Sequence, residues 1–147
     1  MKKYVKAVIT MAAFALITSA TSFAGLGGTS LKVTIPFSFE ISGKTLPAGT
    51  YSVSQSSSSA MSIRNGSSRI SEVFQVTGTS RSNSDGKTRL RFARYGNIYF
   101  LTAVMTGDEY NQLPQSSTER DIVKRLESKG GSRRKSETVN IEAQLSR

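Results

Sequence analysis

Apolar and polar residues alternate along the segment 31–41, near the start of the chain. The apolar set falls on every second position and comprises Leu31, Val33, Ile35, Phe37, Phe39 and Ile41. A period of two predicts a β-strand with one face turned towards a core. Pro36 has no N–H for a ladder hydrogen bond, so we expect this strand to lie at a sheet edge or to carry a bulge.

A corner follows at Leu46-Pro47-Ala48-Gly49. Proline presets φ at the second turn position, and glycine is favoured at the fourth position of a type I turn. The corner leads into a strand in which Tyr51 and Val53 share one face. We expect the Tyr51 hydroxyl to bond a backbone group, as at the aromatic corners of β-sandwiches.

Alternation and turn signals continue through the middle of the chain. Met61 and Ile63 lead into Asn65-Gly66, which predicts a hairpin whose partner strand starts at Ile70. The run 98–105 is apolar on both faces and therefore predicts the central strand of a sheet.

The period changes after Pro114. Ser116-Ser117-Thr118-Glu119 forms a capping box and predicts a helix over 117–129, ended by Gly130-Gly131. A last alternating segment predicts a strand over 138–145. The fold class that follows is mainly β, a β-sandwich or small open barrel of about seven to eight strands with one C-terminal-side helix.

The first 24 residues have the pattern of a secretory signal peptide. Three lysines precede an apolar run, 7–17, and small residues stand at Ser22 and Ala24. We expect cleavage after Ala24, with Ala20 as the alternative, and a single domain over 25–147. The apolar run is shorter than the roughly 20 residues that span a bilayer, so no transmembrane segment is expected after cleavage. The predicted location is periplasmic or extracellular.

Charge and composition limit the classes of partner. Three of the 20 basic residues lie in the leader and none of the 10 acidic ones does, so the mature chain has a formal charge of +7. For an exported protein this favours anionic envelope polymers, with solubility as the alternative reason for the charge. Nucleic acid is not expected, because no binding module for it is present and export removes the chain from the cytoplasm.

The residues available for catalysis are few. The chain has no histidine and no cysteine, which removes the usual general base, the thiolate nucleophile and the common zinc ligands. The acidic residues are scattered and stand in no motif; they include Glu40, Glu72, Asp85, Asp108 and Glu109. We therefore expect no enzyme, no metal site and no cofactor, and a hydrolase without a visible motif is the third-ranked hypothesis.

Two basic groups are the candidate binding residues. Arg89, Arg91 and Arg94 stand close to Tyr95 and Tyr99, and guanidinium groups beside aromatic rings can hold phosphate, carboxylate or sugar. The alternative is that they form the solvated face of a strand. A second group, Arg133, Arg134 and Lys135, is predicted to contact polyanions from a loop.

Several short motifs in order resemble a known family. They are Ile35-Pro36-Phe37-Ser38-Phe39, Gly43-Lys44-Thr45-Leu46-Pro47-Ala48-Gly49-Thr50-Tyr51, Arg91-Phe92-Ala93-Arg94-Tyr95-Gly96, Tyr99-Phe100-Leu101 and Leu113-Pro114-Gln115-Ser116 with Glu119-Arg120. The chain is similar in these to a family of small exported proteins, frequent in acidobacterial genomes, that has no assigned activity. The resemblance implies export and a β-rich domain, and it brings no catalytic or binding residue.

The function expected from these features is that of an exported, non-enzymatic interaction protein of the cell envelope or the extracellular space. The alternative is a small binding module for an anionic glycan or lipid. A shift of the melting temperature by a defined small ligand would distinguish the second from the first.

Overall fold

The computed structural model describes residues 30–81, 86–107, 109–128 and 136–146. The predicted signal peptide over 1–24 lies outside the described residues. The same is true of Asp85, of Asp108 and of the predicted helix end, Lys129 to Gly131. The basic group Arg133, Arg134 and Lys135 also lies outside them.

The described residues contain twelve strands and one helix. The strands are β1 (Ser30–Ile35), β2 (Phe39–Ile41), β3 (Lys44–Leu46), β4 (Gly49–Ser57), β5 (Ala60–Asn65), β6 (Ile70–Gln75), β7 (Gly78–Arg81), β8 (Arg89–Tyr95), β9 (Ile98–Thr106), β10 (Glu109–Gln112), β11 (Glu137–Glu142) and β12 (Gln144–Ser146); the helix is α1 (Ser117–Ser128). The mainly β fold class is confirmed. The number of strands exceeds the expected seven or eight, because several expected strands are interrupted.

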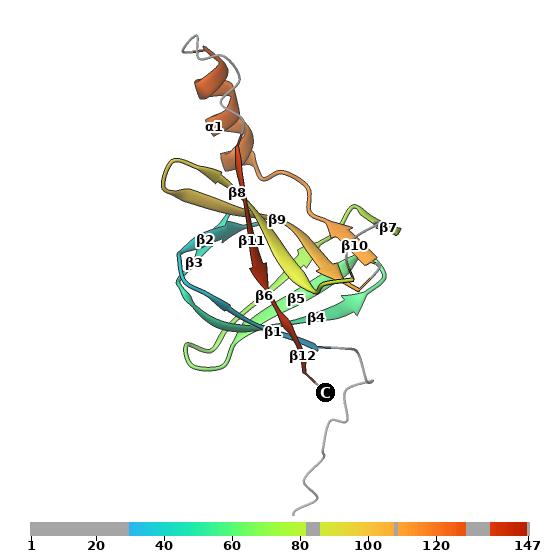
Figure 1. Ribbon diagram of the computed structural model, residues 1–147. Coiled ribbons are helices and arrows are strands. Elements are labelled where there is room, and N and C mark those ends of the chain that lie inside the picture. Colours follow the sequence, from blue (N-terminus) through green and yellow to red (C-terminus); the bar gives the residue numbers. More distant parts are fainter. Residues whose placement is uncertain (1–29, 82–85, 108, 129–135, 147) are drawn as a thin grey trace, which may run out of the picture.

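Two sheets face each other and form a β-sandwich (Figure 1). One sheet has the order β12-β1-β4-β5-β6, and the other has the order β11-β8-β9-β10-β7 with β2 joined to β9 and β3 to β2. The apolar faces of both sheets supply one core cluster, in which Ile35, Ile63 and Leu90 have no exposed surface. The run 98–105 lies in β9, between β8 and β10, as the apolar pattern predicts.

The segment 31–41 is two strands and not one. β1 lies in the first sheet and ends at Ile35, and β2 lies in the second sheet and begins at Phe39. Pro36 stands where the chain leaves the first sheet, which suits a residue that cannot donate to a ladder. The proline therefore marks a crossing between the sheets, and the expected single strand with an edge or a bulge is corrected.

The predicted hydrogen bond of the Tyr51 hydroxyl to a backbone group is confirmed. The Tyr51 side chain is fully buried, and its hydroxyl donates a hydrogen bond of 2.6 Å to the carbonyl oxygen of Pro47. The Tyr51 ring meets the Phe39 ring edge-on, with 5.5 Å between centroids. The ring thus packs in the core while its polar end is satisfied by the backbone.

Phe37 is less buried than its place in the alternating pattern suggests. Its ring stacks on Tyr99 with 3.9 Å between centroids and meets the Phe92 ring edge-on at 5.2 Å. It packs against the core cluster without being enclosed by it. This position follows from the crossing at Pro36, since Phe37 belongs to neither strand.

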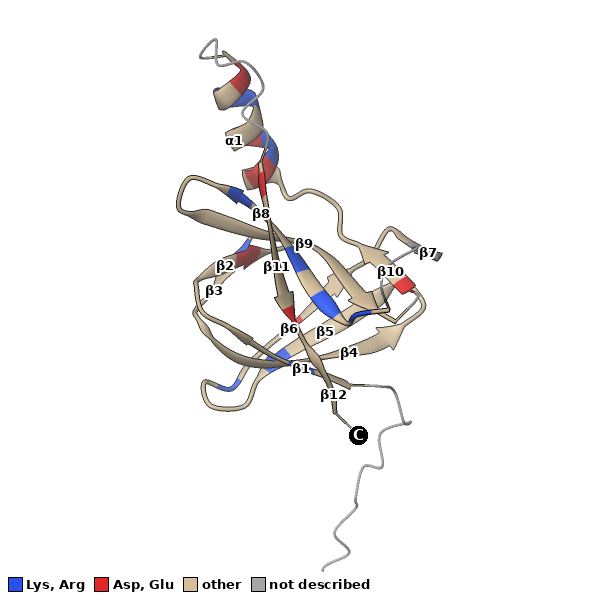
Figure 2. Ribbon diagram, viewed as in Figure 1, with Lys and Arg blue, Asp and Glu red and all other residues tan. Residues whose placement is uncertain are grey.

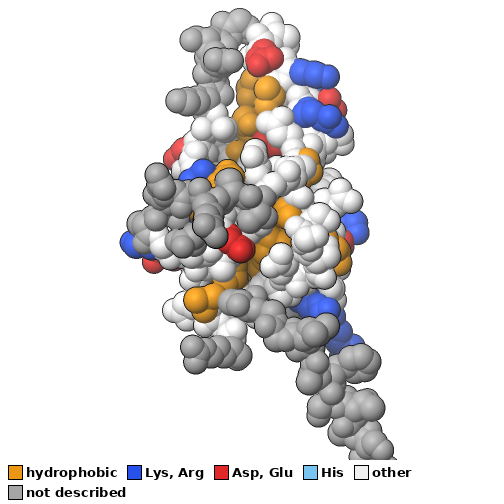
Figure 3. Space-filling view, turned by 90° about the vertical axis from the view of Figure 1, so that its right-hand side faces the viewer, with side chains coloured by type: hydrophobic (Ala, Val, Ile, Leu, Met, Phe, Trp, Pro, Cys, Tyr) orange, Lys and Arg blue, Asp and Glu red, His pale blue; other side chains and the backbone are white. Residues whose placement is uncertain are grey.

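Helix α1 begins where the capping box places it. The Ser116 hydroxyl oxygen accepts a hydrogen bond of 3.1 Å from the Glu119 amide. Beyond its first turn the helix extends away from the two sheets (Figure 1). Its apolar stripe, Ile122, Val123 and Leu126, is half-buried, and hydrophobic side chains gather along the helix (Figure 3).

The expected final strand over 138–145 is also two strands. β11 pairs with β8 in the second sheet, and β12 pairs with β1 in the first. Ala143 stands between them, and its amide donates to the Thr88 carbonyl at 3.0 Å. The end of the chain therefore ties the two sheets together along one side of the sandwich.

Candidate functional site

Strand β8 divides the predicted arginine and tyrosine cluster between two faces. Leu90 and Phe92 have no exposed surface and point into the core. Alternation therefore places Arg94 on the core-facing side, and Arg89, Arg91 and Tyr95 on the other. Figure 2 shows the basic positions spread along β8. The residues of the cluster do not converge on one point.

The two arginines on the outer face lie across neighbouring strands. The Arg89 Nε donates to the Met105 sulfur at 3.2 Å. The Arg91 guanidinium carbon lies 5.5 Å from the centroid of the Tyr110 ring, a cation–π arrangement. The Arg91 Nε is buried and has no hydrogen-bond partner. Both side chains thus pack over this face of the sheet.

Arg94 is engaged within the chain. Its Nε donates to the Gly96 carbonyl at 2.7 Å, and its Nη1 donates to Glu137 Oε2 at 3.3 Å. Its guanidinium carbon lies 5.5 Å from the centroid of the Tyr99 ring. An anion that bound this fork would compete with Glu137.

Two buried carboxyl groups lie at the base of α1, and no sequence pattern indicates that they meet. Glu119 is 3% exposed and Glu40 is 7% exposed. The Tyr95 hydroxyl donates to Glu119 Oε1 at 3.2 Å, and the Ser116 hydroxyl donates to Glu40 Oε1 at 2.7 Å. Ser116 thus joins the helix cap to Glu40, which is 76 residues away in the chain.

Burial changes the proton affinity of this cluster. Burial raises the pKa of Glu119 above its ordinary value, and the nearby charge of Glu40 adds to this rise, although the hydrogen bond from Tyr95 lowers it. Burial likewise raises the pKa of the Tyr95 hydroxyl. Both effects on Glu119 disfavour its charged form. The first turn of α1 is therefore attached to the sandwich through a proton-sensitive contact.

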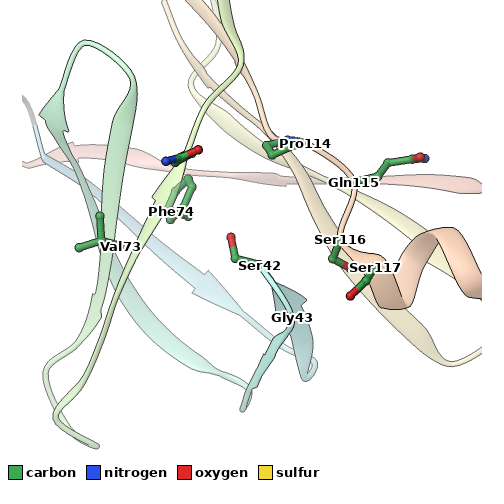
Figure 4. Close-up of a pocket in the computed structure, with 9 residues that line it drawn as sticks. Ser42, Gly43, Val73, Phe74, Pro114, Gln115, Ser116 and Ser117 are labelled. Carbon is green, nitrogen blue, oxygen red and sulfur yellow. The ribbon is translucent and has the colours of Figure 1, made fainter.

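A hollow of about 380 Å³ opens beside this cluster, between the two sheets (Figure 4). Its walls come from three distant parts of the chain. They are Ser42 and Gly43 in the β2–β3 turn, Val73, Phe74 and Gln75 in β6, and Pro114, Gln115, Ser116 and Ser117 before and at the start of α1. Figure 4 shows β6 and the segment 114–117 on opposite sides, with the turn between them.

The chemistry of the hollow is that of hydroxyl, amide and apolar groups. None of the described residues that line it is titratable. Glu40 and Glu119 are not among the lining residues, and Ser116 stands between them and the hollow. The floor includes Ser42 at φ 51°, a left-handed conformation that is uncommon for serine. The hollow is thus suited to binding, and its lining offers no acid or base for proton transfer.

Strand β6 is an edge of its sheet. Among the strands of the described residues, only β5 pairs with it. Val73 on β6 is 64% exposed, more than Ile98 and Leu145, the other exposed large apolar residues in the described part of the chain. An open edge offers unpaired backbone groups to another chain, so this border of the hollow is a natural contact surface.

The described part of the chain holds neither a group of side chains placed for a metal ion nor a membrane-spanning helix. It contains no group of three or more acidic side chains placed to hold a metal ion. No helix in it has the length and apolar character required to cross a membrane.

By its architecture the chain belongs to the class of mainly β proteins in which two sheets form a sandwich and one helix is appended. Comparison with family models, with curated proteins and with solved structures found no match. The resemblance to the acidobacterial family therefore stays a prediction.

Proposed function

We propose that this protein is an exported, non-enzymatic interaction protein, periplasmic or extracellular, and that it meets its partner at the hollow beside β6. The observation that carries the proposal is the hollow itself, bordered by an open strand edge and by the exposed Val73. Hydroxyl, amide and apolar groups line it, which favours recognition over catalysis.

Export is part of this proposal and rests on the leader. Ser22 and Ala24 suit a signal peptidase, so the mature chain should begin at Gly25. The intact mass of the exported protein tests this directly. A mass that retains residues 1–24 would contradict it.

Site-specific cross-linking tests the interaction. A photo-reactive amino acid replaces Val73 in the full-length protein, which is expressed in its own cells. The matched control carries the same amino acid at Asn97, in the exposed turn between β8 and β9. We expect a discrete cross-linked protein at Val73 only. Ser117→Phe, which fills the hollow from its other wall, should abolish the product, whereas Ser117→Ala should not. Equal cross-linking at both positions, or none at either, would contradict the proposal.

The second candidate is a binding module for an anionic glycan or lipid. The observation that favours it is Arg91, whose Nε is buried without a partner while its guanidinium faces Tyr110. Arg91→Lys keeps the charge and removes the planar fork. Retention of the protein on lipopolysaccharide is then measured. A retention that falls in this variant, and falls further with added salt, would favour the second candidate over the first.

A further inference from the structure

The hollow follows the backbone edge of β6 and not one face of it. Three consecutive residues, Val73, Phe74 and Gln75, line it. Successive side chains of a strand point to opposite faces, so a cavity against one face would meet every second residue. Contact with all three indicates that the cavity runs along the edge, where the backbone groups are.

The pairing of β6 with β5 shows which backbone groups face the hollow. The Val76 amide donates to the Ser59 carbonyl at 2.9 Å, and β5 and β6 pair antiparallel in the register Met61↔Phe74. In such a ladder every second residue exchanges both hydrogen bonds with its partner. The N–H and C=O groups of Phe74 and Glu72 therefore point to β5, and those of Val73 and Gln75 point away from it.

We propose that the hollow binds an extended segment of a partner polypeptide, which adds to β6 as a further strand. This inference rests on the proposed function and names its kind of partner. Outward backbone groups at two alternate residues, Val73 and Gln75, are the arrangement that strand addition uses. Recognition of a lone side chain or of a sugar ring would not require backbone groups at every second residue.

The opposite wall argues for a single strand and against a second copy of this chain. Pro114 to Ser117 bound the hollow on the side away from β6. Pairing with the edge of another sandwich would bring a whole sheet against that wall, whereas a strand needs about 4.8 Å beyond β6. The Lys44–Glu72 ion pair, 2.8 Å long, joins β3 to β6 beside the lining residues Gly43 and Val73 and is itself no part of the lining.

The composition of the lining also indicates which residue types the bound segment carries. The lining is uncharged and mixes hydroxyl, amide and apolar groups. A segment rich in threonine and valine fits this surface and has a high tendency to form strands. Binding of such a segment should be insensitive to salt, in contrast to binding of a polyanion.

A disulfide-tethering experiment tests strand addition. The chain has no cysteine, so Gln75→Cys creates one unique thiol at the hollow, and Asn97→Cys provides the matched control at an exposed turn. The probe is the peptide Cys-Gly-Thr-Val-Thr-Val-Thr amide, equilibrated with each protein in a mild thiol buffer. Two further probes carry N-methyl groups on the valines only or on the threonines only. N-methylation removes backbone donors and leaves the side chains in place.

The expected result is stronger disulfide linkage at the hollow than at the control position. This linkage should depend on which alternate residues of the peptide carry N-methyl groups. The unmodified peptide should link to the Gln75→Cys protein about tenfold more than to the Asn97→Cys protein, which corresponds to about 1.4 kcal/mol. One methylated probe should keep this advantage and the other should lose it, because only alternate donors face β6. Adding Ser117→Phe should also remove the advantage.

Two results would overturn the inference. Equal linkage of the unmodified peptide at both positions would show that the hollow does not select an extended segment. Equal behaviour of the two methylated probes would show that binding does not use a strand ladder. In either case, a partner that still cross-links at Val73 would leave the proposed function standing and refute strand addition alone.

Discussion

Replacing Ser116 with alanine should destabilise the protein by much more than a lost helix cap. The Ser116 hydroxyl accepts from the Glu119 amide at 3.1 Å and donates to Glu40 Oε1 at 2.7 Å. Ser116→Ala removes both hydrogen bonds. It leaves the Glu40 carboxyl group, which is 7% exposed, without this donor.

The expected cost follows from the two bonds. Loss of an N-cap hydroxyl costs about 1 kcal/mol. Loss of a hydrogen bond to a buried carboxyl group costs about 1.5 to 3 kcal/mol. The sum predicts that the free energy of unfolding falls by about 2.5 to 4 kcal/mol, whereas the cap alone, which is all that the sequence reveals, predicts about 1 kcal/mol.

Urea-induced unfolding of the mature protein measures this difference. Ser116→Thr keeps a hydroxyl and should retain most of the stability. Ser117→Ala changes a neighbouring exposed serine and should alter the free energy by less than about 0.5 kcal/mol. A cost for Ser116→Ala of about 1 kcal/mol or less would refute the bond to Glu40 as a structural contact.

Three further predictions concern Glu119, Tyr51 and Phe37. The raised pKa of Glu119 means that its neutral form favours folding below its ordinary value of 4.5 and that this contribution is lost as pH rises through the folded pKa. Unfolding free energies of parent and Glu119→Gln should therefore diverge as pH rises from acid to neutral, with the variant becoming relatively more stable; parallel pH profiles would contradict this. Tyr51→Phe, which removes the bond to Pro47, should cost about 1 kcal/mol in urea unfolding, and no measurable cost would count against the corner. Phe37→Ala should cost about 2 kcal/mol and Phe92→Ala, fully buried, about 3 to 5 kcal/mol; equal costs would show that Phe37 is core.

Local chemistry was predictable from the sequence because each signal involves neighbouring residues. The corner at Pro47 and the cap at Ser116 depend on turn and helix geometry within a few positions. The class of the fold followed from alternation with a period of two.

Contacts between distant segments were not predictable from the pattern. Glu40 falls on the polar face of the alternating segment, yet it is only 7% exposed and accepts a hydrogen bond from Ser116, the residue that precedes α1. The hollow likewise needs three segments, 42–43, 73–75 and 114–117, whose meeting depends on how the sheets are paired. Alternation identifies two faces of a strand but does not say what covers each of them.

The alternation of side chains along a strand also explains why the predicted binding cluster on β8 does not form one site. Arg91 and Arg94 are close in the chain, but an odd separation places them on opposite faces. Arg94 also has partners in Gly96 and Glu137 that no local pattern indicates. The lipopolysaccharide experiment tests anion binding by these arginines.

Hydrogen exchange at single amides tests the central claim most directly, namely that the open edge of β6 is where the partner binds. In the free protein, the amides of Val73 and Gln75 should exchange rapidly, whereas those of Glu72 and Phe74 should be protected by β5. With the partner isolated through the Val73 cross-link, the amides of Val73 and Gln75 should become protected. Unchanged exchange at Val73 and Gln75, with new protection along β8 instead, would contradict the account.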